Sequence, residues 1–225
     1  MRRLNVHKNQ GFTLLEILIA LAITGILAAL TGPNLLAWLN RNTVQEATDS
    51  IQSALRDAQK QAMRRGRICT INFTNGTGTS PTVYSQITAS EAGCLVANND
   101  KANPLILPLP ENANELSLSL PQEVFMVVSN FPTLGGSPGV QFSFRGHVPG
   151  LTFTPPEKQA IIVLYPATAN TPREPYPNQE RKCIVMASLL GIVKQGTYNG
   201  DPLVPPDKLD ANNCQIRLDG TGTEP

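Results

Sequence analysis

The chain has 225 residues, of which 41% are hydrophobic and 16% are charged, and its formal net charge is +1. This length suits one folded domain plus a membrane anchor. Arg2, Arg3 and Lys8 supply three positive charges near the N-terminus, so the rest of the chain carries about −2. Such a balance excludes a general nucleic-acid-binding protein that works through net charge.

A short basic segment precedes a long apolar one. Residues 1–11 end in Gly11, and between residues 12 and 39 the only ionisable side chain is Glu16. About 20 apolar residues span a bilayer as a helix, so residues 12–39 are predicted to form a transmembrane segment. An ordinary secretory signal is cleaved after its apolar run, whereas here the small residue comes first and the helix would stay in the product. The basic leader would remain in the cytoplasm and the rest of the chain would be exported.

Glu16 is the one carboxylate within this apolar run. A charge in the membrane costs about 2.5 to 3.5 kcal/mol on insertion scales, so such a residue is a functional hypothesis that needs a partner. The alternative is a local role, because a negative charge near the start of a helix is favoured by the helix dipole. Both interpretations of Glu16 stay open at this level.

Gly11-Phe12-Thr13-Leu14-Leu15-Glu16 after a basic leader resembles the type III signal of type IV prepilins and type II secretion pseudopilins. The resemblance implies cleavage after Gly11 by a prepilin peptidase and methylation of the new N-terminus at Phe12. It also implies that Glu16 pairs with the terminal amine of a neighbouring subunit during assembly. The implied partners are the peptidase, other pilin or pseudopilin subunits and the inner membrane.

The helix is predicted to continue beyond Pro33 as an amphipathic segment over residues 40–66. Proline removes one intrahelical hydrogen bond and clashes with the preceding turn, so a kink is expected at Pro33; many pilins resemble this chain in having a proline there. Apolar residues then recur at spacings of three and four: Val44, Ala47, Ile51, Ala54, Leu55, Ala58 and Ala62. Arg64, Arg65 and Gly66 suit a helix C-terminus.

Residues 67–225 are predicted to be an exported, β-rich globular domain. Strands are expected at 67–73, 82–88, 116–120, 124–129, 140–144, 151–154, 160–165, 183–188 and 191–194. Short strands separated by Gly and Pro turns indicate an antiparallel sheet. The proline-rich segments 166–181 and 198–208 are predicted to be long loops. The expected fold class is α+β: a pilin-like fold with a long kinked N-terminal helix packed on an antiparallel β-sheet.

Four cysteines, Cys69, Cys94, Cys183 and Cys214, all lie in the expected exported region. An even number of cysteines outside the cytosol favours disulfides. Three pairings are possible, and the local pairing of Cys69 with Cys94 and of Cys183 with Cys214 is favoured. A zinc site is the alternative, but the chain has no Cys-x-x-Cys and His147 is the only histidine after the leader.

Catalytic, cofactor and metal sites have no positive support in the sequence. It has no recognisable Ser, His and Asp arrangement and no phosphate-binding glycine loop. Asp201, Asp207 and Asp210 could hold calcium, but their spacing matches no defined loop and they are interpreted as solvated turn residues. We therefore expect no enzyme activity, no cofactor and no metal.

A second resemblance narrows the expected family. Residues 44–67 resemble the helix end of GspH/FimT-type pilins, and Phe142-Ser143-Phe144-Arg145-Gly146 resembles a turn of those domains. The implied function is structural: a minor pilin or pseudopilin in a type IV pilus or a type II secretion filament. The alternative is an extracellular DNA-binding minor pilin for DNA uptake, which makes nucleic acid a possible partner although the charge does not support it. A membrane-anchored enzyme is the remaining class, without a visible catalytic constellation.

Overall fold

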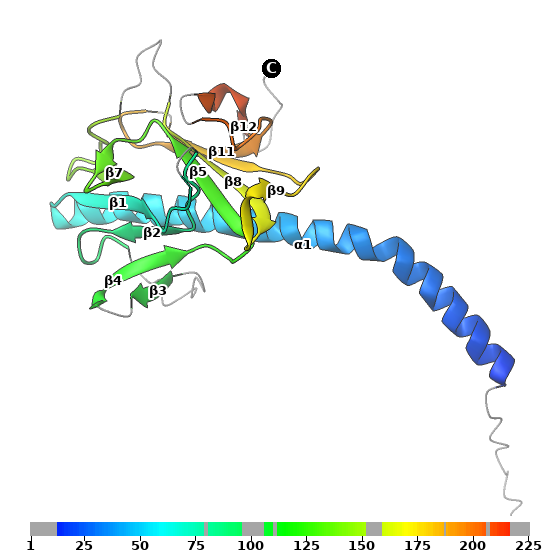
Figure 1. The fold of residues 1–225 in the computed structure, drawn as a ribbon. Helices are drawn as coiled ribbons and strands as arrows, with labels where there is room; N and C mark the ends of the chain where they lie inside the picture. Colours follow the sequence, from blue (N-terminus) through cyan, green and yellow to red (C-terminus); the bar gives the residue numbers. More distant parts are fainter. Residues whose placement is uncertain are drawn as a thin grey trace, which may run out of the picture. The chain divides into compact units, whose positions relative to one another are not determined.

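A computed structural model describes residues 13–78, 81–95, 106–109, 112–151, 159–186, 188–205 and 208–216, with the side chains of 30–34, 36, 106–109 and 112–116 left out. The chain divides into two units, Met1–Leu39 and Asn40–Pro225. One long helix, α1 (Leu14–Arg65, 52 residues), contributes to both. In the second unit α1 packs against antiparallel β-sheets (Figure 1), so the predicted α+β class is confirmed.

The C-terminal end of α1 lies where the basic residues and glycine predicted it. Gly66 has φ +63°, a conformation that glycine adopts without strain. The Arg67 N–H donates to the Ala62 carbonyl at 3.2 Å, as in a Schellman motif. The helical assignment continues past position 33, which confirms the predicted resumption of the helix. The kink at Pro33 stays a prediction, because that side chain lies outside the described ones.

The first sheet is antiparallel and has the order β3-β4-β2-β1-β7-β6 among the described residues. Its strands are β1 (Cys69–Thr74), β2 (Gln86–Ala89), β3 (Ile106–Leu109), β4 (Asn112–Ser119), β6 (Thr133–Leu134) and β7 (Ser137–Phe142). Buried and partly exposed residues alternate in β2, as expected for a strand with one face on a core. Ile71 pairs with Ala89 of β2 and with Val140 of β7. Strand β1 therefore lies between β2 and β7 in the interior of the sheet.

The second sheet has the order β12-β11-β10-β8-β5, with β9 paired to β8. Its strands are β5 (Val124–Ser129), β8 (Ile161–Thr168), β9 (Thr171–Pro175), β10 (Lys182–Met186), β11 (Val193–Tyr198) and β12 (Cys214–Ile216). Every residue of β5 is buried, and so are the first seven residues of β8. Continuous burial requires that both faces of this sheet are covered.

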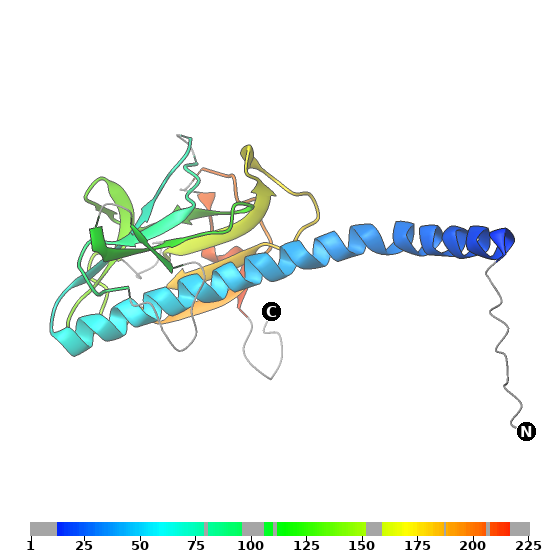
Figure 2. The same cartoon turned by 90° about the horizontal axis from the view of Figure 1, so that it is seen from below.

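Two apolar clusters cover those two faces. The larger cluster joins the buried residues of α1 to the first sheet and to one face of the second, through residues such as Ile162, Ile184 and Val193. All seven α1 residues of the predicted apolar stripe are buried. Figure 2 shows the cyan part of α1 running alongside the orange strand β11. The smaller cluster lies on the opposite face, where Val163, Val185 and Tyr198 pack with Leu209 and Cys214.

Both predicted disulfides are present. Cys69 is bonded to Cys94, and Cys183 is bonded to Cys214. The second bond links β10 to β12 across the intervening strand β11. The favoured local pairing is therefore confirmed.

Several expected element boundaries were wrong. Segment 166–181 is not one long loop, because β8 extends to Thr168 and a turn leads into β9. Prolines are tolerated in β9 because it is an edge strand that pairs only with β8 among the described strands. Strands β3, β6 and β12 were not predicted, since each is short and lacks an alternating apolar pattern. The strand expected at 151–154 falls mostly outside the described residues.

Candidate functional site

Thr13 caps the start of α1 and thereby fixes the position of Glu16. The Glu16 N–H donates to the Thr13 hydroxyl at 3.2 Å and to the Thr13 carbonyl at 3.1 Å. Thr13-Leu14-Leu15-Glu16 has the spacing of a capping box, in which a threonine N-cap is followed three residues later by glutamate. Glu16 is thus held in the first turn of α1, where the helix dipole favours a negative charge.

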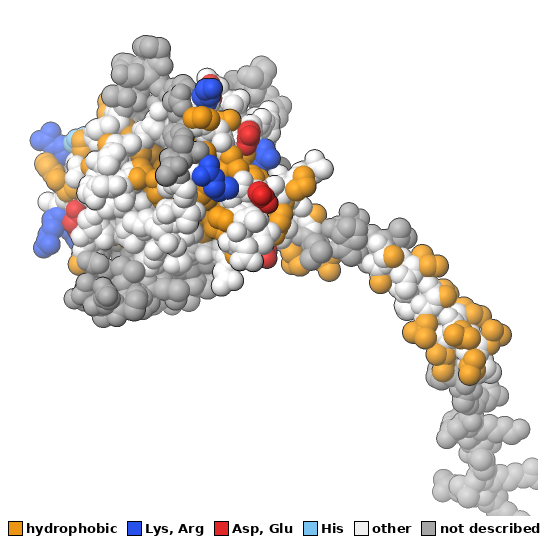
Figure 3. Space-filling model, viewed as in Figure 1, with side chains coloured by type: hydrophobic (Ala, Val, Ile, Leu, Met, Phe, Trp, Pro, Cys, Tyr) orange, Lys and Arg blue, Asp and Glu red, His pale blue; other side chains and the backbone are white. Residues whose placement is uncertain are grey.

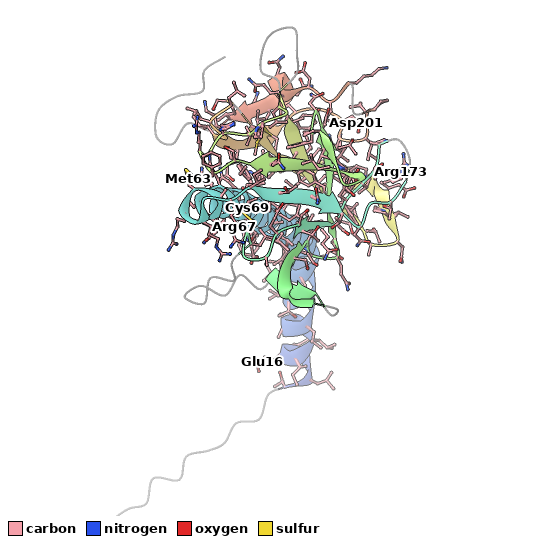
Figure 4. All side chains as sticks on the ribbon, turned by 90° about the vertical axis from the view of Figure 1, so that its left-hand side faces the viewer. Glu16, Met63, Arg67, Cys69, Arg173 and Asp201 are labelled. Carbon is pink, nitrogen blue, oxygen red and sulfur yellow. A yellow bond between two sulfur atoms is a disulfide. The ribbon has the colours of Figure 1, made fainter. Side chains whose placement is uncertain are left out.

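Apolar side chains surround Glu16 along the described N-terminal part of α1. Leu14 is 78% exposed and Ile17 is 51% exposed, and neighbouring leucines and isoleucines as far as Leu27 are similarly open. Figure 3 shows these side chains as an orange surface, and Figure 4 marks Glu16 among them. Exposed apolar surface of this extent marks a site that contacts lipid or another protein.

Thr24 is a described polar residue of this helix segment whose hydroxyl is satisfied within the helix. The Thr24 hydroxyl donates to the Ala20 carbonyl at 2.9 Å and lies 3.1 Å from the Leu21 carbonyl. A hydroxyl that bonds its own helix can enter an apolar environment without leaving an unpaired donor. Glu16 is the only ionisable residue among the described residues of positions 13–39.

The part of the chain that the structure describes contains no helix that is both long enough and apolar enough to cross a membrane. This differs from the transmembrane segment expected over residues 12–39. That expectation also counted residue 12, residues 30–34 and residue 36, which lie outside the described residues or side chains.

Gln59 connects α1 to two turns of the globular unit. Its Nε2 donates to the Gly146 carbonyl at 2.6 Å and to the Leu190 carbonyl at 2.7 Å. Gly146 ends the turn that the sequence singled out, with its N–H bonded to the Ser143 carbonyl at 2.8 Å. Figure 4 labels Met63, near this end of α1, close to Arg67 and Cys69. These contacts hold the outer half of α1 against the sheets.

The other residues considered as functional candidates have local partners. Asp201 accepts the Leu203 N–H and Asp210 accepts the Asn212 N–H, both at 2.9 Å, so each carboxylate stabilises a turn. Asp207 lies outside the described residues. His147 shares a hydrogen bond of 2.6 Å with the Ser143 hydroxyl, within the same turn. Among the described residues no cluster of His, Cys, Asp and Glu could hold a metal.

Gly11 and Phe12 lie outside the described residues, so cleavage, methylation and the pairing of Phe12 with Glu16 stay predictions. Two anchoring residues were missed at the sequence level. Thr13 could have been found from the capping-box spacing. Gln59 offered no such signal, because its two acceptors come from turns about 90 and 130 residues away.

Comparison with protein families gives one match. Residues 6–32 match the model described as the prokaryotic N-terminal methylation motif. No curated protein and no solved structure matches the chain. The match includes Gly11, Phe12 and Glu16 and supports a type IV pilin-like protein.

Proposed function

We propose that this chain is a structural minor pilin or pseudopilin of the GspH/FimT type. A prepilin peptidase cleaves it after Gly11, the new N-terminus at Phe12 is methylated, and the protein assembles into a type IV pilus or a type II secretion filament. Until assembly it is anchored at the inner membrane with its globular unit outside the cytoplasm. The match of residues 6–32 to the N-terminal methylation motif is the observation that carries this proposal.

The geometry around Glu16 supports an assembly role. A carboxylate fixed by a capped first turn among exposed apolar side chains can enter an apolar filament interior only with a positive partner. The methylated amine of Phe12 on a neighbouring subunit would be such a partner. The apolar side chains would pass from lipid to the filament interior without contacting water, which avoids the free-energy cost of exposing them.

The assignment to the GspH/FimT type rests on features of the globular unit. Its α1 has the predicted apolar stripe, and the Phe142–Gly146 segment forms a tight turn that contacts α1 through Gln59. The resemblance to GspH/FimT-type pilins covers the residues of this helix end and of this turn, and it supports the proposed subtype. The methylation motif belongs to structural proteins, which agrees with a role as a filament subunit rather than as an enzyme.

The test separates charge from capping at Glu16. Glu16→Gln keeps the size of the side chain and satisfies the capping-box pattern, which accepts glutamine, but it removes the charge. If Glu16 pairs with a terminal amine, that amine is left buried and unpaired at a cost of about 3 to 5 kcal/mol. We expect Glu16→Gln protein to be cleaved normally and to be absent from sheared filaments, as measured by quantitative immunoblotting of filament and membrane fractions.

Thr13→Val is the matched control, because it removes the capping hydroxyl and leaves the charge of Glu16. A lost cap costs about 1 kcal/mol, so this variant should still enter filaments. Normal filament content of Glu16→Gln protein, or equal loss for both variants, would refute the proposed charge pairing.

A further inference from the structure

A groove runs along α1 where the helix meets the edge of the second sheet. Its volume is about 710 Å³, within the range of about 300 to 1,000 Å³ that is usual for ligand sites. Its walls are residues of α1 from Arg41 to Arg56, the first five residues of β11, and Lys182 and Ile216. All of these residues belong to the second unit of the chain.

Cations dominate the charge of this groove. Arg41, Arg56, Lys182 and Lys194 line it, and none of the described lining residues is acidic. Glu180 lies beside it and forms ion pairs with Arg41 and Lys182. Asp49 also lies beside the groove, where it accepts from the lining residue Gln45 at 3.0 Å. Two carboxylates against four cations leave a local excess of positive charge, so the groove is complementary to an acidic partner.

The sheet edge beside the groove is only partly covered. Among the described residues β12 pairs with residues 196–198 of β11, and residues 193–195 have no strand partner on that side. The Tyr198 N–H bonds to Arg181 on the β10 side, and the Asn199 N–H bonds to Asn213 on the β12 side. Since backbone groups alternate along an antiparallel strand, those of Gln195 point to the open side.

Two further observations concern the polar groups at this edge. The Val193 carbonyl accepts from Gln52 Nε2 and from Arg56 Nη2, both at 3.4 Å, so α1 side chains already satisfy it. The Gln195 Oε1 is buried and has no hydrogen-bond partner within the described part of the chain. A bound group with N–H donors and a C=O acceptor could form hydrogen bonds with the Gln195 Oε1 and with the backbone N–H and C=O of Gln195.

The size of the groove selects among anionic ligands. Arg41 and Arg56 are 15 positions apart on α1, which is about 22 Å along a helix. Six residues in extended conformation cover about 20 Å. A single phosphate is too short to contact both ends. A nucleic acid strand needs several unpaired cations along its phosphates, whereas Arg41 and Lys182 are already paired with Glu180.

We propose that this groove binds an acidic peptide segment of a partner protein in extended conformation. The segment adds to the edge of β11 at Gln195 that no described strand covers, and it places its carboxylates near Arg56 and Lys194, the two lining cations that Glu180 does not pair. Strand addition of this kind takes affinity from backbone hydrogen bonds and specificity from alternate side chains. The site does not depend on cleavage at Gly11 or on filament assembly.

The chain's own residues after Ile216 are the main competitor for the same edge. Residues 217–225 contain Arg217 against Asp219 and Glu224, so their acidic excess is small. Charge complementarity therefore favours a more acidic segment from another protein. The experiment must separate these two occupants.

The probe is a fluorescein-labelled peptide, acetyl-Glu-Thr-Glu-Thr-Glu-Thr-amide, titrated with the full chain in a non-ionic detergent and followed by fluorescence anisotropy. We expect saturable binding that weakens as salt is raised. Lys194→Glu should weaken it by about tenfold, because Lys194 is an exposed lining cation whose side chain has no ion pair with another described residue. Arg64→Glu makes the same charge change on α1 outside the groove and should leave binding unchanged.

A second peptide with N-methylated backbone amides keeps the carboxylates but cannot donate the hydrogen bonds of an added strand. It should not bind. Equal binding of both peptides would show that the groove attracts any polyanion without adding a strand. This result would overturn the proposal.

Two further measurements test whether another molecule or segment occupies the groove. Displacement of the probe by inorganic phosphate or by phosphatidylglycerol vesicles, at an ionic strength held constant with sodium chloride, would point to a phosphate group instead of a peptide. Probe binding that occurs only after deletion of residues 217–225 would show that the chain's own segment fills the groove. Either result would overturn the assignment of an acidic partner segment.

Discussion

At the scale of single residues, close contacts between α1 and the turns of the globular unit decide which side chains are allowed. Gly146 has φ +81°, and a Cβ at this position would lie 2.8 Å from Met63 Sδ. Its carbonyl also accepts the Gln59 amide. The glycine is therefore required by its backbone conformation, whereas Met63 is 47% exposed and has room to move.

Gly146→Ala should lower the free energy of unfolding by about 1 to 2 kcal/mol, because an alanine at positive φ is strained. The displacement of Met63 adds to this cost. Gly135→Ala is the control, since Gly135 has φ +62° with nothing within 4 Å of its Cβ position. Urea unfolding followed by circular dichroism measures both variants, and an equal loss for the two would show that the contact with Met63 costs nothing.

Glu180 is the residue whose charge should make stability depend on pH. Burial by itself raises the pKa of Glu180, but the hydrogen bond and charge of Lys182, the charge of Arg41 and the Thr197 hydroxyl outweigh it. The pKa in the folded protein is thus below the ordinary value of 4.5. Its contribution to stability is complete above the unfolded pKa and is lost as the pH falls through the folded pKa.

Glu180→Gln should therefore destabilise the protein at pH 7, by about 1 kcal/mol because solvent partly screens these ion pairs. The difference from the unmodified protein should shrink as the pH falls below 4.5. Thermal unfolding between pH 3 and 8 measures it, with the exposed Glu174→Gln as control. A difference that is constant over this pH range would contradict the role of the Glu180 charge.

At the scale of elements, the second sheet is unusual because both of its faces are buried. α1 covers one face, and the segment after β11 covers the other with Leu209 and Cys214. That segment carries few apolar side chains of its own. The bond between Cys183 and Cys214 holds it on the sheet through a closed loop with a sequence separation of 31.

Replacing Cys183 and Cys214 together by alanine should lower the free energy of unfolding by about 3 to 4 kcal/mol in the chain-entropy model. Hydrogen exchange should then become faster in β12 and in the adjacent edge of β11. The Cys69→Ala and Cys94→Ala pair has a similar separation of 25 in the first sheet and should leave β12 protected. Unchanged exchange in β12 of the first variant would show that packing alone holds this segment.

At the scale of the whole molecule, the two parts of α1 differ in their surroundings. In its described N-terminal part the apolar side chains are exposed, and from Val44 to Ala62 those of the apolar stripe are buried against the sheets. The first part leaves its apolar side chains exposed, and the second contributes to the core of the globular unit. The methylation motif covers only the first of these parts.

We predict that the mature protein begins at Phe12 with an N-methyl group, because residues 6–32 match the N-terminal methylation motif. Mass spectrometry of the intact protein purified from membranes measures the N-terminus. Gly11→Leu should block cleavage and leave the basic leader attached. A mature N-terminus beyond residue 30 would contradict this processing.

Local chemistry in the sequence was sufficient to predict several features of the fold and of the candidate site. The spacing of Val44 to Ala62 predicted the buried stripe of α1, and Arg64 to Gly66 predicted its end. Strand β5 was predicted with its observed bounds, because residues 124–128 form one apolar run that ends at Ser129. Glu16 was recognised because it is the only charge in an apolar segment. Each of these signals lies within a few turns of helix or one strand.

The remaining features depended on contacts between distant segments. The sequence could not reveal that the strands divide into two sheets, because the order of strands depends on pairing between residues far apart. The hairpin of β8 and β9 was missed because proline argues against a strand unless an edge position is available. The contacts of Gln59 and the cationic groove form only when α1 lies against turns and strands from the second half of the chain. The sequence by itself therefore determined the helix, its apolar stripe and the N-terminal motif, whereas tertiary packing decided which surfaces remained open to partners.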